Sequence, residues 1–265
     1  MQQRVIHQVW YQGEAHIPEK YEAARTKLRR LNPEWTYKLW DDASLRRLCR
    51  QYGYGDAYDA AKIMHQRIDF GRYVALLAHG GISIDMDTEA LRPLRVFVDQ
   101  FKPQTKIGIT LSSANPIESS IAYMRPATRF FNNATIVCPH ANMVEMKMIC
   151  DHMANLLRSQ TRLLRSLPES FQIQRTTGPL AFTDAVMSIP ANRVEFIPAD
   201  VFEPCIGFDK ACTPSSSSVM SHQHDGTWHS FGKAFESYYW AKRHPVLLVI
   251  VLLLLVSLWY RCRRK

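Results

Sequence analysis

Apolar and polar residues follow two different periods along the first part of the chain. Short apolar runs at residues 4–10 and 35–40 predict strands, because alternate side chains of a strand point to opposite faces of a sheet. Residues 18–31 and 43–52 instead place apolar side chains at helical intervals, which predicts amphipathic helices. Strands that alternate with helices are typical of α/β proteins, so we expect a mainly parallel sheet covered by helices.

A longer helical pattern and an acidic strand end follow. Residues 56–79 keep helical spacing up to the glycine pair at 80–81, and glycine ends helices because it adopts backbone angles that other residues rarely adopt. Residues 82–87 then alternate apolar and polar side chains, which predicts a strand. The end of this strand carries two carboxylates, those of Asp85 and Asp87.

The pattern is weaker beyond residue 100. Residues 143–166 predict another helix, and residues 212–222 form a serine-rich segment that we interpret as a loop. Six cysteines are scattered without a C-x-x-C pair, so we expect buried thiols, with a Cys205–Cys212 disulfide as the alternative in an oxidising compartment. Residues 133–135 match the glycosylation sequon, a pattern that often occurs by chance.

The charge of the chain is distributed unevenly. Of the 33 Lys and Arg residues, six lie at or after Lys242, whereas all 24 Asp and Glu residues lie at or before Glu236. The remaining 27 basic residues nearly balance the 24 acidic ones, so the formal charge of +9 does not indicate nucleic-acid binding. A composition of 46% hydrophobic and 22% charged residues excludes a disordered chain.

The basic surplus flanks a long apolar run. Residues 246–260 contain no charged side chain, and basic residues stand on both sides of them. We predict a single membrane-spanning helix at 246–260, preceded by a linker at 236–245 and followed by a basic tail at 261–265. The basic tail favours a lumenal position for the preceding domain, whereas a lone anchor without an N-terminal signal segment favours a cytosolic one.

Asp85 and Asp87 are the first candidates for chemistry. Two carboxylates two residues apart at a strand end can both reach one hard divalent cation through oxygen. On the preceding helix, Asp69 and Arg72 share a face, and together they can hold a polyol by accepting from hydroxyls and donating to oxygens. Taken singly, the two pairs are equally compatible with a solvated strand end and a surface ion pair.

The order of these residues resembles a known family. Residues 61–87 contain Asp-x-x-Arg-Tyr, Gly-Gly-Ile and Asp-x-Asp, the signature of the DXD glycosyltransferases of family 32, which include Och1-type α-1,6-mannosyltransferases and mannosyl inositol-phosphoceramide synthases. Residues 6–10, 32–35 and 39–42 are similar to the same family in the same order. The segment HQHDGTWH at residues 222–229 resembles its closing His and Gly-Ser-Trp segment.

The resemblance implies a fold and an activity. Residues 1–235 are expected to form a GT-A domain, the Rossmann-like fold of nucleotide-diphospho-sugar transferases. The implied reaction is a metal-dependent, retaining transfer of a hexose to a membrane lipid such as inositol-phosphoceramide or to a glycan. It uses Mn²⁺ or Mg²⁺ and a nucleotide sugar, with GDP-mannose as the first expectation for the donor and a UDP-hexose as the second. The expected location is the membrane of the Golgi or endoplasmic reticulum, or the host endomembranes if the chain is viral.

The resemblance also assigns roles on the donor side. Trp10 is expected to stack on the nucleotide base, with His7 and Gln8 beneath it on the first strand. Asp69 and Arg72 are expected to hold the donor sugar. These assignments give the chain a predicted donor pocket at the end of its first strand and on one face of its long helix.

The metal side follows from the same resemblance. Asp87 is the expected direct metal ligand, and Asp85 is expected to contact ribose, sugar or metal; with Asp69 and Arg72 they form the predicted catalytic group. Either His222 or His224 is expected to complete the metal shell. The segment expected to close over the leaving diphosphate consists of Gly226, Thr227 and Trp228.

Two other hypotheses stay open at this point. Residues 82–88 also fit the haloacid-dehalogenase phosphatase pattern, in which Asp85 is the nucleophile, although the later acidic pair of that fold is not found after residue 100. The chain can also be an inactive sugar-nucleotide fold that serves as a scaffold. Metal-dependent hydrolysis of a sugar nucleotide separates the transferase from the inactive scaffold.

Overall fold

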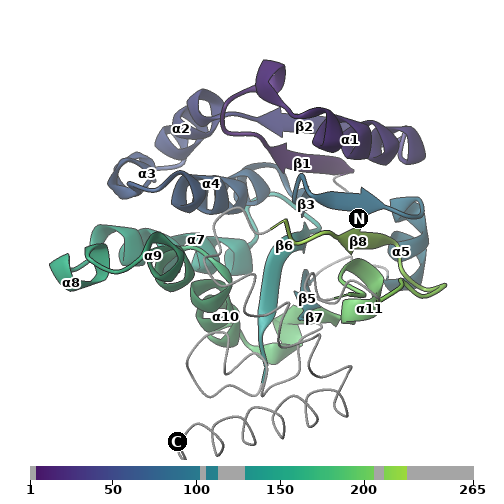
Figure 1. Ribbon diagram of the computed structural model, residues 1–265. Helices are drawn as coiled ribbons and strands as arrows, with labels where there is room; N and C mark the ends of the chain where they lie inside the picture. The colour runs from purple at the N-terminus through teal and green to yellow at the C-terminus, as the bar shows by residue number, and fades with distance from the viewer. Residues whose placement is uncertain (1–3, 102–105, 113–128, 206–211, 226–265) are drawn as a thin grey trace, which may run out of the picture.

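Strands at the centre of the molecule form one six-stranded sheet in the order β2-β1-β3-β6-β5-β7 (Figure 1). The computed structural model describes residues 4–101, 106–112, 129–205 and 212–225. The central strands are β1 (Val5–Val9), β2 (Thr36–Trp40), β3 (Gly81–Ile84), β5 (Ile107–Leu111), β6 (Phe131–Cys138) and β7 (Val194–Ile197). A second, two-stranded sheet pairs β4 (Thr88–Ala90) with β8 (Met220–His222).

The central sheet is mixed. Strand β1 is parallel to β2 and β3, and β5 is parallel to β7, but β6 is antiparallel to both of its neighbours. The α/β class and the expectation of a mainly parallel sheet are therefore confirmed; among the described strands of this sheet, only β6 runs in the opposite direction. Its apolar sequence could not reveal this, because hydrophobic patterning does not encode strand direction. Because β6 runs in the opposite direction, its first half lies beside the end of β3, and the backbone amide of Asp85 donates to the carbonyl oxygen of Ala134.

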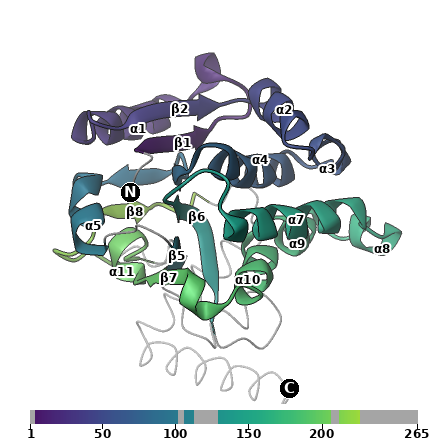
Figure 2. The same ribbon diagram turned by 180° about the vertical axis from the view of Figure 1, so that it is seen from behind.

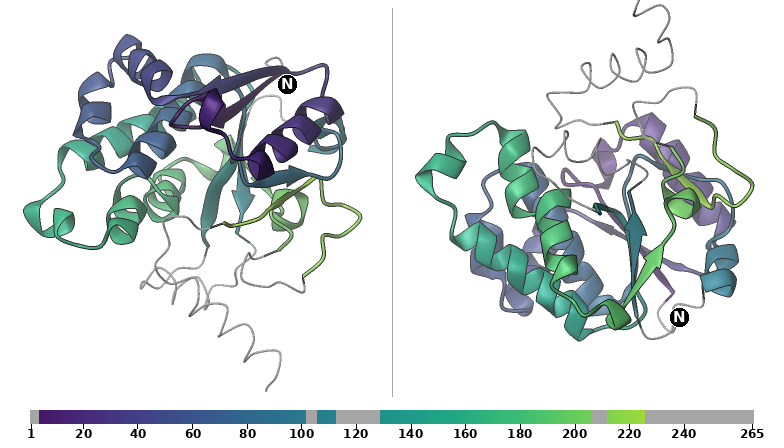
Figure 3. Two further views of the ribbon diagram at one scale, coloured as in Figure 1. Left: turned by 45° about the horizontal axis from the view of Figure 1, so that its top comes forward. Right: turned by 90° about the horizontal axis from the view of Figure 1, so that it is seen from below.

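Helices cover both faces of the sheet (Figures 2 and 3). One apolar core lies under α2, α3, α4, α7 and α10, and the other lies under α1, α5 and α11. The helices on the first face are α2 (Asp42–Gln51), α3 (Gly55–Ala60), α4 (Met64–His79), α7 (Val144–Arg158), α8 (Arg162–Arg165), α9 (Glu169–Thr176) and α10 (Pro179–Met187). Those on the second face are α1 (Glu19–Leu31), α5 (Leu94–Phe101) and α11 (Ala199–Phe202). Short 3-10 turns lie at Glu14–His16 and Ala191–Arg193.

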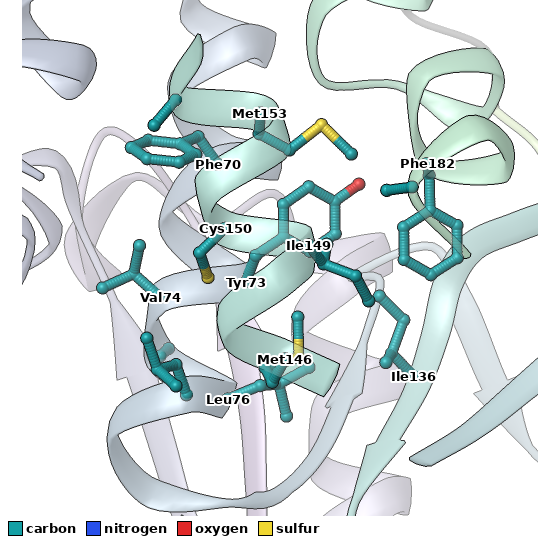
Figure 4. Packing of buried hydrophobic residues seen from close by; sticks show 14 of the residues in the cluster. Phe70, Tyr73, Val74, Leu76, Ile136, Met146, Ile149, Cys150, Met153 and Phe182 are labelled. Atoms are coloured by element: carbon teal, nitrogen blue, oxygen red, sulfur yellow. The ribbon is translucent and has the colours of Figure 1, made fainter. Parts of the chain in front are cut away.

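Helix α4 is buried along most of its length and packs against α7 (Figure 4). The ring of Tyr73 on α4 stacks on that of Phe182, with 5.5 Å between their centroids. Ile149 and Met153 of α7 are fully buried in the same cluster. Burial of such large apolar side chains contributes about 1.5–3 kcal/mol each, so α4 is held firmly in the core.

Three sequence predictions need correction. The pattern at 56–79 is two helices, because the side chain of Gln66 accepts from the amides of Lys62 and Ile63 and caps a new start there. The pattern at 143–166 is broken before α8, where the Thr161 hydroxyl caps the helix. The serine-rich segment contains strand β8, which periodicity missed because the strand is only three residues long.

The glycine pair before β3 is required by its neighbours. Gly80 and Gly81 have φ values of +61° and +97°, which other residues rarely adopt. A side chain on Gly81 would overlap the carbonyl oxygen of Val5, and one on Gly80 would lie 2.8 Å from the carbonyl carbon of His140. The close approach is therefore to the protein's own strand β1 and to the turn after β6.

The predicted membrane helix at 246–260 lies outside the described residues. Within the described ranges, every helix is too short or too polar to cross a membrane. The boundaries at residues 235, 245 and 260 stay predictions.

Candidate active site

One side of the candidate site is built on helix α4. Asp69 and Arg72 lie one turn apart on it and face the beginning of β6. The Asp69 carboxylate is 9% exposed; it accepts from the amide of Asn133 at 3.0 Å and from the hydroxyl of Thr177 at 3.4 Å. Arg72 donates to the carbonyl oxygen of Asn133 at 2.7 Å and to the carboxylate of Asp85. We call Asp69, Arg72 and Asn133 the sugar side.

Asn133 was not predicted as a site residue. Its amide also donates to the Tyr73 hydroxyl at 2.8 Å, and that hydroxyl donates to the carbonyl oxygen of Thr177. With 5% exposure and both amide hydrogens engaged, Asn133 is a structural asparagine rather than an accessible glycosylation acceptor in the folded protein. The available signal was the pair of amides at 132–133 within the otherwise apolar run of β6.

Burial sets the protonation of the sugar side. It raises the pKa of Asp69 to about 7, although the nearby Arg72 charge opposes the shift. Burial likewise raises the pKa of Asp85, again against the Arg72 charge. The guanidinium of Arg72 stays charged, because Asp85 and Asp69 outweigh the cost of its burial. Its buried Nε has no hydrogen-bond partner among the described residues, which leaves one donor for a ligand oxygen.

The other side of the site is built from residues far apart in sequence. His222, at the end of β8, brings its Nε2 to 3.1 Å from one oxygen of Asp87 and to 3.9 Å from Asp85. The antiparallel pairing of Thr88 with His222 holds this arrangement. The second oxygen of Asp87 accepts from the backbone amide of Asp225 at 3.0 Å. We call Asp85, Asp87 and His222 the metal side.

Asp87 and His222 remain charged, whereas burial raises the pKa of Asp69 and of Asp85. Burial acts to raise the pKa of Asp87, but His222 and the Asp225 amide outweigh it and hold the pKa well below its usual value. Burial acts to lower the pKa of His222, yet the carboxylates of Asp87 and Glu203 raise it well above its usual value. The structure therefore pairs an imidazolium with a carboxylate at this point.

The metal side fits a divalent cation. One ligand atom each from Asp85, Asp87 and His222 can be chosen so that all lie within 4.8 Å of one another. Two carboxylate oxygens and one imidazole nitrogen suit Mn²⁺, and the oxygens alone suit Mg²⁺. The geometry also separates the two candidate histidines, because His222 contacts the DXD carboxylates whereas His224 groups with Glu203 and the ring of His222, 4.0 Å away.

The first strand carries the residues predicted to bind the nucleotide. Trp10 follows β1; its indole donates to the carbonyl oxygen of His16 at 2.9 Å, and its ring lies 5.4 Å from that of Tyr21. The Tyr21 hydroxyl donates to Asp225 at 2.8 Å, the residue whose backbone amide binds Asp87. Three contacts, Trp10–Tyr21, Tyr21–Asp225 and Asp225–Asp87, therefore link the predicted base-stacking residue to the metal side.

His7 and Gln8 support the site from inside. His7 is fully buried; its Nδ1 accepts from the indole of Trp40 at 3.1 Å, and its Nε2 donates to the carbonyl oxygen of Gly80 at 2.8 Å. Burial lowers the pKa of His7 to about 3, so this ring is neutral. Gln8 donates to the backbone carbonyl of Asp85 at 3.2 Å and accepts from Tyr37. Both residues therefore hold the strands and turns beneath the site.

The structure does not describe the predicted closing segment. Gly226, Thr227 and Trp228 lie outside the described residues. Asp225 and Glu203, both placed at the metal side by the fold, were not among the sequence candidates. Asp225 lies within the segment 222–229 that resembles the family, whereas nothing in the local sequence of Glu203 marks it.

Comparison with known families identifies the segment that carries the sugar side and the DXD acids. Residues 18–107 match the model of the glycosyltransferase sugar-binding region containing the DXD motif. The segment includes Asp69, Arg72, Asp85 and Asp87, whereas Trp10 and His222 lie outside it.

Several curated proteins are similar to part of the chain. The uncharacterized glycosyltransferase L373 of Acanthamoeba polyphaga mimivirus is 33% identical over 97 residues, 36% of this chain and 39% of the relative. Inositol phosphoceramide mannosyltransferase 3 of Schizosaccharomyces pombe is 36% identical over 34% of this chain and 26% of its own length. Mannosyl phosphorylinositol ceramide synthase SUR1 of Saccharomyces cerevisiae is 29% identical over 40% of this chain and 29% of its own length. The chain thus spans well under half the length of these relatives.

Solved structures show more remote likenesses. Mouse xyloside xylosyltransferase 1 in its apo form aligns with a TM-score of 0.48 and 12% identity, over 88% of this chain and 93% of that one. The PaToxG glycosyltransferase aligns with a TM-score of 0.46 and 16% identity, over 69% and 68%. Scores of this size do not decide the fold, which rests on the sheet described above. Residues 18–107 therefore resemble the glycosyltransferase sugar-binding region that contains a DXD motif, and part of the chain is similar to curated glycosyltransferases.

Proposed function

We propose that the chain is a metal-dependent glycosyltransferase with a GT-A domain, which moves a hexose from a nucleotide sugar to an acceptor. The observation that carries the proposal is the convergence of Asp85, Asp87 and His222 beside Asp69 and Arg72. The site lies where β1 and β3 end, and the carboxyl ends of strands are where ligands bind in open α/β sheets. The mixed sheet and the family match support the GT-A assignment.

The metal side would act on the leaving diphosphate. Asp87 and His222 would hold the cation, with Asp85 beside them. A bound divalent cation offsets the negative charge that develops on the departing phosphate. The Asp225 amide and the strand pairing of β4 with β8 keep the Asp87 carboxylate in place before any ligand arrives.

The sugar side would hold and stabilise the transferred sugar. The buried Arg72 can donate to a sugar or phosphate oxygen while it remains paired with Asp85. Asp69 can accept from sugar hydroxyls and, when ionised, can stabilise the positive charge that develops on the sugar ring as the bond breaks. We further propose that the anomeric configuration is retained and that a phosphate oxygen of the donor takes the proton of the acceptor hydroxyl.

The donor and acceptor are proposed from the relatives. Two of these are named as enzymes that mannosylate inositol phosphoceramide, so GDP-mannose is the first donor to test and a UDP-hexose the second. A membrane lipid such as inositol-phosphoceramide, or a glycan, is the proposed acceptor. An anchor at residues 246–260 and an endomembrane location, in the Golgi or endoplasmic reticulum, would bring the site close to such a lipid.

A panel of GDP- and UDP-sugars tests the proposal with the purified full-length chain. Hydrolysis of each donor is measured with Mn²⁺, with Mg²⁺ and with a chelator, beside Asp87→Asn and the control Asp99→Asn, an exposed acid on α5. Cleavage of one donor that needs metal, survives in Asp99→Asn and is lost in Asp87→Asn supports the transferase. Absence of both hydrolysis and nucleotide binding across the panel would favour the inactive scaffold.

The stereochemistry has its own measurement. When an acceptor has been found, NMR of the first product formed distinguishes the α and β anomers before they equilibrate. A product with the configuration of the donor supports retention. An inverted product would reject it and would require a protein group that acts as the base.

A further inference from the structure

Glu203 is a deeply buried acid without a role in the reaction described above. It ends the short helix α11, where its backbone amide donates to the carbonyl oxygen of Ala199 at 2.6 Å, and its side chain is 1% exposed. Burial of a carboxylate is costly unless hydrogen bonds compensate it. The burial of this acid beside the metal side therefore requires an explanation in the contacts it makes.

The contacts of Glu203 converge on one carboxylate oxygen. Its Oε1 accepts from the side-chain amide of Asn132 and lies 3.0 Å from Nδ1 of His222. The orientation of the Asn132 amide is determined, because its oxygen accepts from the backbone amide of Ala134 at 2.9 Å. The nitrogen of Asn132 must therefore face Glu203, so this neighbour of Oε1 is a donor.

The opposite nitrogen of the same ring faces the DXD acids. His222 Nε2 lies 3.1 Å from Asp87, and the ring is only slightly exposed between the two acids. Histidines that bind metals usually donate their other ring N–H to a carboxylate or carbonyl, which sets both the tautomer and the orientation of the ring. The same arrangement is found here: Asn132 contacts Glu203, Glu203 contacts Nδ1 of His222, and Nε2 of His222 contacts Asp87.

We propose that Glu203 is a positioning residue, which keeps the proton of His222 on Nδ1 and aims Nε2 at the cation site between Asp85 and Asp87. Asn132 in turn holds Glu203. This inference rests on the proposed function for the identity of the ligand, a divalent cation. Because Glu203 acts through His222, it contacts neither the cation nor the donor.

A second cation between Glu203, His222 and His224 is the competing explanation, since these residues also form a compact group. The contacts favour a positioning role. The Oε1 atom that faces the ring already accepts from the Asn132 amide, and its separation of 3.0 Å from Nδ1 is that of a direct hydrogen bond. The number of Mn²⁺ ions bound per chain distinguishes the two.

Mn²⁺ binding to the full-length chain tests the proposal without any sugar donor. Glu203→Leu removes the acceptor and should weaken Mn²⁺ affinity about 10- to 100-fold, whereas Glu203→Gln keeps an acceptor oxygen and should lose far less. The matched controls are the same two substitutions at Glu145, a buried glutamate of α7 that pairs with Arg193. Calorimetry gives affinity and stoichiometry, and ¹⁵N NMR of the Mg²⁺-loaded chain reports the protonation of the His222 ring.

We expect one Mn²⁺ per wild-type chain and a proton on Nδ1 of His222. Mn²⁺ affinity should fall only in the two Glu203 variants, and it should fall further in Glu203→Leu than in Glu203→Gln. Three results would overturn the proposal. Glu203→Leu could bind Mn²⁺ with wild-type affinity, the Glu145 controls could lose as much Mn²⁺ affinity as the Glu203 variants, or the wild type could bind no Mn²⁺. Two ions in the wild type and one in Glu203→Leu would replace it with the second-cation site.

Two further outcomes keep the result decisive. If Glu203→Leu does not fold, the wild-type spectrum decides, because an unprotonated Nδ1 contradicts the proposed hydrogen bond. A chain that binds Mn²⁺ as expected but cleaves no donor in the panel would reject the transferase activity and leave the role of Glu203 standing.

Discussion

The sugar side and the metal side of the site are built in different ways. Asp69 and Arg72 come from one turn of one helix, so their proximity is already given by helical geometry. Asp87 and His222 are 135 residues apart and meet only because β4 pairs with β8. A motif whose residues are neighbours on one helix can therefore be recognised in a sequence, whereas metal ligands that are brought together by the pairing of distant strands cannot.

Strand β6 serves both sides through two consecutive residues. Successive side chains of a strand point to opposite faces. Asn133 contacts Asp69 on the sugar side, and Asn132 contacts Glu203 behind the metal side. The alternation of side chains along β6 therefore lets one strand end contact Asp69 on the sugar side and Glu203 behind the metal side.

Removal of the central metal-side acid should have the largest effect. In Asp87→Asn we expect metal-dependent donor cleavage to fall by roughly 100- to 1000-fold or more, because charge stabilisation of the leaving group is lost. In the wild type, Mn²⁺ at a hundred times its Kd should raise the free energy of unfolding by about 2.7 kcal/mol, and Asp87→Asn should lose this gain. Asp69→Asn should keep it. Denaturant unfolding with and without Mn²⁺ checks both, and equal Mn²⁺ stabilisation of all three proteins would remove the division into two sides.

The sugar side should be revealed by pH. If ionised Asp69 is the active form, cleavage should rise as the pH passes through about 7, the pKa to which burial raises this carboxyl. Asp69→Asn should be slower by about 10- to 100-fold and should lack this rise, because a group that titrates has been removed. A pH–rate profile at saturating Mn²⁺ is the measurement, and an unchanged acidic limb in the variant would assign it to another group.

The same titration has an effect on stability with a defined sign. An unfolded aspartate titrates near pH 4, so between about pH 4 and 7 native Asp69 keeps a proton that the unfolded chain releases. The stability that this group contributes is present below about pH 4 and is lost as the pH rises through about 7. Asp69→Asn should therefore lose less free energy of unfolding than the wild type over this range.

Substitution of Asn132 and Asn133 on β6 should have smaller effects, and these effects should differ between the sugar side and the metal side. Asn133→Ala removes one buried hydrogen-bond donor from Asp69 and one from Tyr73, which should lower the free energy of unfolding by about 1–3 kcal/mol. It should change Mn²⁺ affinity little, whereas Asn132→Ala should weaken it. Denaturant and Mn²⁺ titrations give the free energy of unfolding and the Mn²⁺ affinity of each variant. The same change in Mn²⁺ affinity in both variants would contradict the separate roles.

The smallest effect is expected at the rim. Lys20 donates to both oxygens of Asp225 at 2.6 and 2.5 Å, but its side chain is 61% exposed. Solvent screening limits such pairs to about 0–1 kcal/mol, so Lys20→Ala should unfold almost as the wild type does. A loss above about 2 kcal/mol in the same denaturant assay would show that Asp225 needs this lysine to support Asp87.

Local sequence was sufficient for several elements. Helices α1 and α2 and strands β1, β2 and β3 lie where periodicity predicts them, and the glycine pair ends α4. These features depend on neighbours within a few residues, which a single sequence displays. The break before α4 was missed because it depends on the side chain of Gln66, a contact that periodicity does not show.

The sequence by itself determined the α/β class, the DXD pair with its helical partners, and the resemblance of residues 18–107 to a DXD-containing sugar-binding region. Tertiary structure alone decided that His222 rather than His224 contacts the DXD acids, that β6 runs antiparallel, and that Glu203 stands behind the ring. The physical reason is the distance along the chain between the residues that interact. Helix faces and strand ends are set by the order of adjacent residues, whereas strand direction and buried acid contacts are set by pairing between segments distant in the chain.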